Sequence, residues 1–323
     1  MRAAACVRDC DHCAVISQQV IAIFGPTASG KSAVAEEVSR RIPAELVAAD
    51  SMQVYRGLPI LTNQSPARLV GIWDLDHEAS VGEYQELAHA AIDEILAAGR
   101  TPIVVGGTGL YFRAALADLA LPPAVPAETR ERLERLYDRV GGERAHELLS
   151  ERDPGTAATV HPNDRRRVVR ALELVEAGFS LRPSEDRLWA GETRQPTLIV
   201  GLELPRDELR RRVAERARAM FERGVEDEAR SALAGPISET ARHVHGLREI
   251  AELPREKALE ALIIRTSRLA VYQLRWLRRV PGIVSLDAQR PPGVLADAIL
   301  EMARSRERLP ARGAGGAGRS ADA

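Results

Sequence analysis

A glycine-rich loop constrains the fold more than any other segment of the chain. The loop, Gly25 to Ser32, reads GPTASGKS and matches the pattern G-x-x-x-x-G-K-[ST] in full. It follows an apolar run of strand length (20–24, VIAIF) and precedes an amphipathic stretch (31–42). A strand and a helix in these places are the context in which the pattern forms a phosphate-binding loop. The sequence therefore predicts a site for a di- or triphosphate.

The loop combines backbone and side-chain groups that suit a phosphate anion. Its backbone N–H groups and the N-terminal end of the following helix attract negative charge. Lys31 would add a positive charge, and the Ser32 hydroxyl suits Mg²⁺, the cofactor that we predict. The residues predicted to bind the phosphates are Gly25, Pro26, Thr27, Ala28, Ser29, Gly30, Lys31 and Ser32.

Apolar segments of strand length alternate with helical segments along the chain. Strand candidates at 45–49 and 101–105 are separated by an amphipathic stretch over 81–98. Further strand candidates lie at 196–204 and 282–286. Strands that alternate with helices form parallel sheets covered by helices. The predicted fold class is therefore α/β, a P-loop-type parallel sheet flanked by helices, with a helical insertion domain.

The insertion is predicted from a change of character after Leu121. Pro122, Pro123 and Pro126 interrupt the chain, and charge-rich helical segments without a strand candidate follow. Glycine, alanine, arginine and serine dominate the C-terminal tail, which is typical of disorder. We predict a disordered leader at 1–19, a core at 20–121 and 191–303, an insertion at 122–190 and a disordered tail at 304–323.

The balanced charge of the chain does not exclude a nucleic-acid partner. The formal net charge is −1, but binding depends on local clusters of Lys and Arg rather than on the total. The run DRRRVVR (164–170) is such a cluster, although a solvated helix face with internal ion pairs explains it equally well. No apolar run has the length of a membrane span, and no signal peptide is recognisable. We therefore expect a cytoplasmic protein, and nothing in the sequence requires more than a monomer.

All three cysteines lie near the N-terminus. Cys6, Cys10 and Cys13 have the spacing C-x3-C-x2-C, which resembles the iron–sulfur loop of radical-SAM enzymes. Such a loop is followed by a barrel, whereas a phosphate-binding strand follows here within ten residues. We therefore interpret the segment as an N-terminal extension without a cluster.

Polar residues follow the second and third predicted strands. Asp50 opens the sequence DSMQVYR (50–56), and at the carboxyl end of a parallel strand it would face the ligand crevice. A metal ligand and a helix N-cap are the alternatives for this aspartate. Thr108 lies in GGTGLY (106–111), where paired glycines let the backbone approach a ligand and the hydroxyl can donate a hydrogen bond.

Four motifs together resemble those of bacterial tRNA dimethylallyltransferases. GPTASGKS (25–32), DSMQVYRG (50–57), GGTGLYFRA (106–114) and HPNDRRRVVRALE (161–173) have the order and nearly the separations found in that family. The resemblance covers about residues 20 to 300. It implies a P-loop-type fold whose helical insertion grips the anticodon arm of tRNA. The implied reaction moves a dimethylallyl group from dimethylallyl diphosphate to the exocyclic amine of the adenine 3′ of the anticodon. The implied substrates are tRNAs that read codons starting with U, and diphosphate is released.

The resemblance also implies roles for individual residues. Asp50 would be the general base on the amine, and Thr108 would bond the oxygen between the donor carbon and the diphosphate. Arg216 would bind the diphosphate and stabilise its developing charge. The phosphate-binding loop would hold dimethylallyl diphosphate rather than ATP. The residues implied to contact tRNA are Asp50, Ser51, Met52, Gln53, Thr108, Arg130, Arg166, Arg167 and Arg170.

Several segments depart from the family pattern. LPILTNQ (58–64) stands where the family usually has DIGTAKP, and LVGIWD (69–74) replaces PHHLID. GLRE (246–249) replaces GYKE, and Val271-Tyr272 replaces a basic pair, although Gln273, Trp276 and Arg278 remain. These changes concern substrate contacts more than the chemistry.

Three other functions are compatible with parts of the sequence. A P-loop kinase of a small metabolite would explain Lys31 and Ser32 but not the insertion. A prenyltransferase acting on free adenine nucleotides would share the catalytic residues. A non-catalytic RNA-binding protein would keep only the fold.

Overall fold

The core of the protein is a five-stranded parallel sheet. The computed structural model describes residues 19–123, 125–182, 188 and 191–307. Every strand pair is parallel, and the order across the sheet is β2-β3-β1-β4-β5. The strands are β1 (Val20–Phe24), β2 (Ala44–Ala49), β3 (Thr101–Gly106), β4 (Thr197–Glu203) and β5 (Val284–Asp287).

Both faces of the sheet are buried, which explains why its central strands are apolar throughout. Along β1, Val20 and Phe24 belong to one hydrophobic cluster, whereas Ile21 and Ile23 belong to another. This alternation follows from the twofold side-chain period of a strand. Helices α2 (Lys31–Ser39) and α14 (Pro292–Glu307) contribute to the second cluster and pack against each other.

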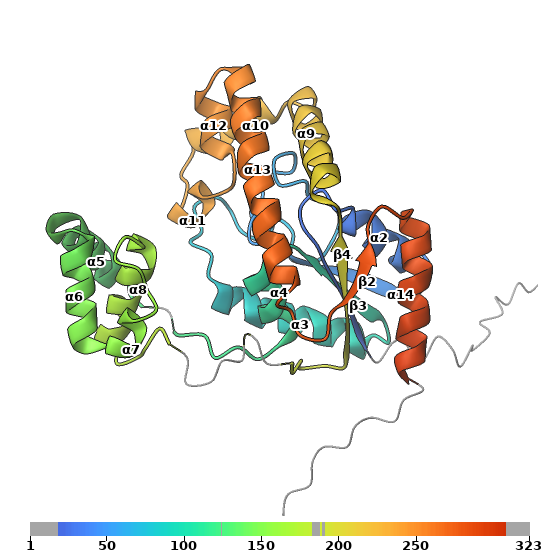
Figure 1. Cartoon of the computed structure of the whole chain (residues 1–323), viewed down its shortest axis with the longest axis horizontal. Helices are drawn as coiled ribbons and strands as arrows, with labels where there is room; N and C mark the ends of the chain where they lie inside the picture. The colour runs from blue at the N-terminus through green and yellow to red at the C-terminus, as the bar shows by residue number, and fades with distance from the viewer. Residues whose placement is uncertain (1–18, 124, 183–187, 189–190, 308–323) are drawn as a thin grey trace, which may run out of the picture.

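The other face carries more helices. Two of them, α3 (Val81–Ala97) and α4 (Gly109–Leu116), lie against the sheet and each other. A second group stands over the carboxyl ends of the strands (Figure 1). It comprises α9 (Arg206–Glu222), α10 (Val225–Ala234), α11 (Glu239–Arg242), α12 (Leu247–Glu252) and α13 (Arg255–Leu277).

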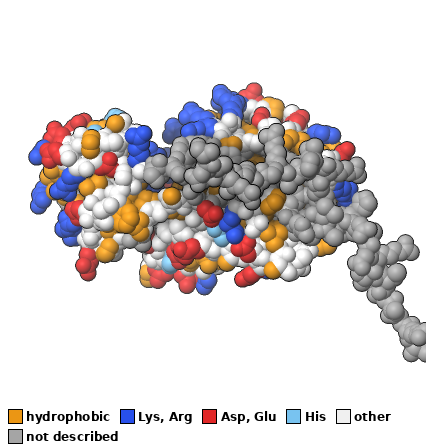
Figure 2. Space-filling model, turned by 90° about the horizontal axis from the view of Figure 1, so that it is seen from below, with side chains coloured by type: hydrophobic (Ala, Val, Ile, Leu, Met, Phe, Trp, Pro, Cys, Tyr) orange, Lys and Arg blue, Asp and Glu red, His pale blue; other side chains and the backbone are white. Residues whose placement is uncertain are grey.

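Of the helices between β3 and β4, the four that follow α4 form a separate body with its own hydrophobic core (Figure 1, green). Leu133, Leu149 and Leu172 are almost completely buried in this core. Figure 2 shows acidic and basic side chains interleaved over its surface. The helices are α5 (Ala127–Val140), α6 (Gly142–Arg152), α7 (Pro154–Ala157) and α8 (Arg165–Glu176).

A buried carboxylate holds the base of this helical body together. Glu173 is 1% exposed, and its two oxygens accept hydrogen bonds from Arg130 Nε at 3.1 Å and Arg170 Nη1 at 2.9 Å. Arg130 also pairs with Glu78 of the core, with 3.6 Å between Nη1 and Oε1. The buried charge of Glu173 is therefore compensated by two arginines of the helical body, and the exposed pair of Arg130 with Glu78 extends this network to the core.

The α/β class and the parallel sheet predicted from sequence are confirmed, and all five strand candidates form strands. The C-terminal boundary was wrong by a few residues, because α14 continues through Glu307 and residues 304–307 are helical. Ala303 is fully buried in the last turns of this helix, so packing extends it into the polar segment. The three cysteines lie outside the described residues. Within the described part of the chain, no helix combines the length and hydropathy needed to cross a membrane.

Candidate active site

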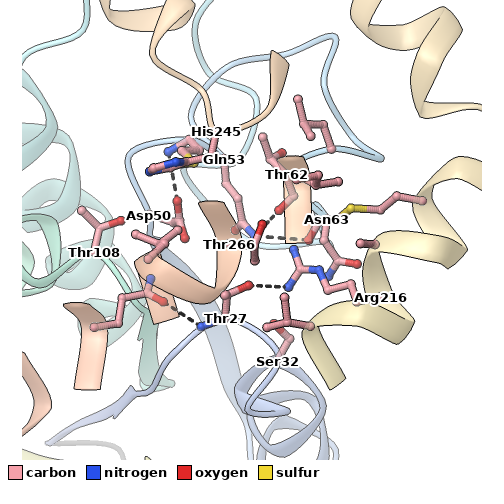
Figure 3. Close-up of a pocket in the computed structure, with 18 of the residues that line it drawn as sticks. Thr27, Ser32, Asp50, Gln53, Thr62, Asn63, Thr108, Arg216, His245 and Thr266 are labelled. Atoms are coloured by element: carbon pink, nitrogen blue, oxygen red, sulfur yellow. Dashed lines mark hydrogen bonds between the residues drawn. The ribbon is translucent and has the colours of Figure 1, made fainter. Parts of the chain in front are cut away.

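A pocket lies above the carboxyl ends of β1, β2 and β3, beneath α9 and α13 (Figure 3). Parallel sheets bind ligands at this edge. The pocket collects residues from segments far apart in the sequence. Its polar lining consists of Thr27, Lys31, Ser32, Asp50, Gln53, Thr62, Asn63, Thr108, Arg216, His245, Thr266 and Gln273.

The phosphate-binding loop has the left-handed backbone conformations that let it curl around an anion. Gly30, with φ of 88°, is the N-cap of α2, and Ala28 adopts φ of 64°. A left-handed alanine is strained, and such strain is typical of a functional loop. Ser29 is 2% exposed, and its Oγ has no hydrogen-bond partner. Ser29 does not line the pocket, so its unpaired hydroxyl is a cost of the loop conformation rather than a ligand contact.

Lys31 and Arg216 place two positive charges at the phosphate-binding end of the pocket. Arg216 Nη1 donates to Thr27 Oγ1 at 2.9 Å, while Arg216 Nε is buried without a partner. Burial lowers the pKa of Lys31 to about 8, although Asp50 opposes this shift and Arg216 adds to it. Both side chains therefore carry a desolvated positive charge with few hydrogen-bond partners in the free protein. A polyanion would supply the missing partners and the opposite charge.

Helix α13 fixes the loop from the opposite side. Gln273, 4% exposed, accepts the Thr27 N–H at 2.8 Å. Its amide nitrogen also lies 2.6 Å from where a Cβ on Gly107 would stand, and the backbone oxygen of Gly25 lies 2.8 Å from the same point, so a side chain at position 107 would collide with the phosphate-binding loop. Trp276 excludes a side chain at Gly109 in the same way, since its ring atoms lie 2.1 Å from the ideal Cβ. The glycines of GGTG therefore have different causes: α13 packs on Gly109, whereas the Ala49 backbone oxygen lies 2.1 Å from an ideal Cβ on Gly106.

Asp50 and Thr108 face the pocket from neighbouring strand ends, as predicted (Figure 3). Asp50 Oδ1 accepts the Met52 N–H at 2.9 Å, which fixes the carboxylate in a turn rather than at a helix N-cap. Thr108 Oγ1 accepts the Ser51 N–H at 3.3 Å. The Ser51 hydroxyl lies 3.4 Å from the same oxygen, and either hydroxyl can be the donor of that contact.

The loop at 58–64, which departs from the family pattern, forms one wall of the pocket. Gln53 Nε2 donates to the carbonyls of Thr62 at 3.1 Å and Asn63 at 3.2 Å. Glu228 of α10 accepts the N–H groups of Ile60 at 2.8 Å and Leu61 at 2.7 Å. The loop that departs from the family pattern is therefore ordered by side chains on both sides of it.

An apolar surface completes the pocket. Val213, Ala217 and Met220 lie along one face of α9, and each is buried. Leu262 and Leu269 of α13 stand beside them. The pocket thus combines a cationic end, a carboxylate and a hydrocarbon wall.

The structure brings most of the predicted site residues together. Thr27, Lys31 and Ser32 of the phosphate-binding loop line one pocket together with Asp50, Thr108 and Arg216, whereas the other five residues of the loop are not among its lining residues. The predicted tRNA contacts on the helical body lie outside it, and two of them, Arg130 and Arg170, are engaged by Glu173. Arg166 and Arg167 are exposed on α8.

Sequence reasoning missed several residues of the site. Gln273 was noted only as part of a retained motif, and its contact with Thr27 spans 246 positions. Asn63, Thr62 and His245 line the pocket without any motif that identifies them. Arg113, within GGTGLYFRA, is fully buried and donates to the carbonyls of Leu188 and Glu192, anchoring the return from the helical body to the core.

The residues present fit a magnesium ion that is bound mainly by its substrate. The Ser32 hydroxyl lies in the pocket at the start of α2. No group of three or more His, Cys, Asp or Glu side chains is arranged for a metal in residues 19–307 as described. Mg²⁺ commonly binds with few protein ligands, phosphate oxygens and water. Ser32 and a diphosphate would supply this set.

Comparison with known proteins identifies the family. The model of the IPP transferase family matches residues 53–280, and the isopentenyl transferase model matches residues 18–66. A tRNA dimethylallyltransferase of Streptomyces griseus is 38% identical over 83% of this chain and 90% of its own length. That of Acidothermus cellulolyticus is 39% identical over 90% of this chain and 93% of its own.

A solved structure agrees with these relatives. The tRNA isopentenylpyrophosphate transferase of Bacillus halodurans superimposes with a TM-score of 0.63 at 30% identity, covering 90% of this chain and all of that one. The matches span the phosphate-binding core, the helical body and the helices above the pocket. By sequence and by fold, the chain belongs to the IPP transferase family.

Proposed function

We propose that the protein transfers a dimethylallyl group from dimethylallyl diphosphate to tRNA. The acceptor is the exocyclic amine of the adenine 3′ of the anticodon in tRNAs that read codons starting with U, and diphosphate is released. The observation that carries the proposal is the composition of the pocket. Lys31 and Arg216 form a polyanion cradle beside an apolar wall, and Asp50 stands in the same cavity.

The donor fits the two halves of the pocket. Its diphosphate would lie on the phosphate-binding loop, where Lys31 and the unpartnered Nε of Arg216 compensate its charge. Its five-carbon chain would lie against Val213, Ala217 and Met220, which exclude water. Magnesium, held by Ser32 and the diphosphate, would neutralise the leaving group further.

The chemical step needs a base and a stabilised leaving group. The adenine amine is a weak nucleophile because its lone pair is delocalised into the ring. Asp50 would accept the proton that the amine loses as its nitrogen bonds to the donor carbon. The Thr108 hydroxyl would donate to the oxygen whose bond to that carbon breaks, and Arg216 would stabilise the charge that develops on the diphosphate.

The acceptor would be delivered by the helical body. Arg166 and Arg167 are exposed and would contact RNA phosphates, Arg167 in place of its 3.6 Å ion pair with Asp164, while Arg130 and Arg170 support the body through Glu173. The target base must leave its stack to reach the pocket, at a cost of a few kcal/mol. The described residues of one chain supply the phosphate-binding end, the carboxylate and the apolar wall of the pocket, and we propose that the protein acts as a monomer, in the cytoplasm where tRNA is found.

The test is transfer of radiolabelled dimethylallyl diphosphate to an unmodified tRNA whose anticodon is followed by adenines. We expect Mg²⁺-dependent label on the tRNA and none on AMP or ATP. Asp50→Asn should lower kcat by about 10²–10⁴-fold. It should bind diphosphate at least as tightly as wild type, because a negative charge leaves the pocket. Label on a free nucleotide, or ATP hydrolysis without transfer, would replace the proposal with a nucleotide prenyltransferase or a kinase.

A further inference from the structure

His245 is a pocket residue that the reaction outlined above does not use. It lies in the turn between α11 and α12 and faces the pocket on the side of Asp50, away from Thr27 and Ser32 (Figure 3). The position is therefore remote from the diphosphate cradle and close to the base that acts on the acceptor. A polar side chain here is placed to meet the acceptor rather than the donor.

The two nitrogens of this imidazole are in different surroundings. Nδ1 is buried and has no hydrogen-bond partner, whereas Nε2 is not enclosed in this way. An N–H that is buried without an acceptor costs more free energy than a buried lone pair. The tautomer with its proton on Nε2 is therefore favoured, and this tautomer directs an N–H donor toward the pocket.

The surroundings also keep the ring neutral. Burial and the nearby Arg265 and His243 lower the pKa of His245, although Asp50 and Glu249 oppose the shift. Arg265 and Glu249 are themselves paired with each other. Protonation would place a second N–H at the enclosed Nδ1, where no acceptor is present. His245 is thus a neutral donor at neutral pH.

We propose that His245 donates its Nε2–H to N1 of the acceptor adenine and so selects for this base, an inference that rests on the proposed function. N1 is bonded to the same ring carbon as the amine on which Asp50 acts, so two neighbouring side chains would bond two neighbouring atoms of one base edge. Adenine N1 is an acceptor, whereas N1 of guanine carries a proton and would leave two donors facing each other.

The test uses anticodon stem-loop RNAs that carry adenosine, 1-deazaadenosine or 7-deazaadenosine at the target position. Loss of N1 should lower kcat/KM in both proteins. The factor for the wild type should be about ten times the factor for His245→Leu. The 7-deaza RNA is the matched control, and it should affect both proteins equally. This comparison cancels any change in the reactivity of the amine, because such a change acts on both proteins.

Two further variants separate a hydrogen bond from a packing role. His245→Gln places an amide N–H near the position of Nε2 and should retain most activity, whereas His245→Asn is too short and should resemble His245→Leu. The KM for dimethylallyl diphosphate should be unchanged in all three, which also shows that they are folded. Equal sensitivity of wild type and His245→Leu to loss of N1 would overturn the proposal. Absence of transfer to adenosine RNA by the wild type would instead refute the proposed function.

Discussion

The hydrogen bond between Thr27 and Gln273 joins helix α13 to the phosphate-binding loop, the proposed donor site. Gln273→Leu removes the oxygen that accepts the Thr27 N–H at 2.8 Å but roughly preserves the volume of the side chain. A hydrogen bond between neutral groups contributes about 0.5–1.5 kcal/mol net, whereas a buried donor left without an acceptor costs about 1–3 kcal/mol. Because both residues are buried, we expect the free energy of unfolding to fall by about 1–3 kcal/mol.

The same substitution should weaken donor binding. Thr27 also accepts the hydrogen bond from Arg216 at 2.9 Å, so a loop released from Gln273 no longer holds this arginine toward the diphosphate. A loss of 1.4 kcal/mol of binding free energy is a tenfold change, and we expect the KM for dimethylallyl diphosphate to rise by about this factor. The KM for tRNA should change much less, because the acceptor is proposed to bind on the other side of the pocket.

Gln85→Leu is the matched control. Gln85 Oε1 accepts the Leu119 N–H at 3.1 Å, the same kind of bond at a site outside the pocket. Chemical denaturation and steady-state transfer assays on both variants separate stability from donor binding. Both should be less stable than wild type, and only Gln273→Leu should bind the donor more weakly. Equal donor KM values for the two variants would refute the reasoning that α13 positions the phosphate-binding loop.

Two further predictions follow from buried charges. Because burial holds the pKa of Lys31 near 8 and below its unfolded value, the unfolded chain binds more protons between about pH 8 and 10.5, and stability contributed by this group rises with pH across that window. Lys31→Met should therefore be more stable than wild type by about 1–3 kcal/mol at pH 7 in thermal or chemical denaturation, while losing diphosphate affinity in calorimetry. An unchanged unfolding free energy would argue against a desolvated ammonium at Lys31. Glu173→Leu should lower stability by about 1–3 kcal/mol and expose the helical body to limited proteolysis, since Arg130 and Arg170 lose their shared partner but are partly exposed to solvent. Wild-type protease resistance in that variant would contradict the role of Glu173 in joining the two parts.

Local patterns were sufficient for the elements of the core. The strand candidates at 20–24 and 101–105 are short apolar runs next to glycine. Because both faces of these strands are buried, their sequences need not alternate between apolar and polar residues, and a continuous apolar run was enough to recognise them. The phosphate-binding loop was equally predictable, because its glycines, Lys31 and Ser32 act through backbone conformation and neighbours within a few residues. The motifs DSMQVYRG and GGTGLYFRA located Asp50 and Thr108 for the same reason.

Tertiary structure alone decided how the site is completed. The family resemblance implied a role for Arg216, but its contact with Thr27 spans 189 positions and that of Gln273 spans 246, and no local pattern encodes where two helices will cross a loop. The arginines of 164–170 look alike in sequence, yet Arg170 is held by a buried glutamate whereas Arg166 and Arg167 are exposed. The tautomer and direction of His245 depend on which of its nitrogens is enclosed by packing. The sequence therefore determined the strands and the anion cradle through local backbone preferences, and the packing of distant helices determined which side chains complete the pocket.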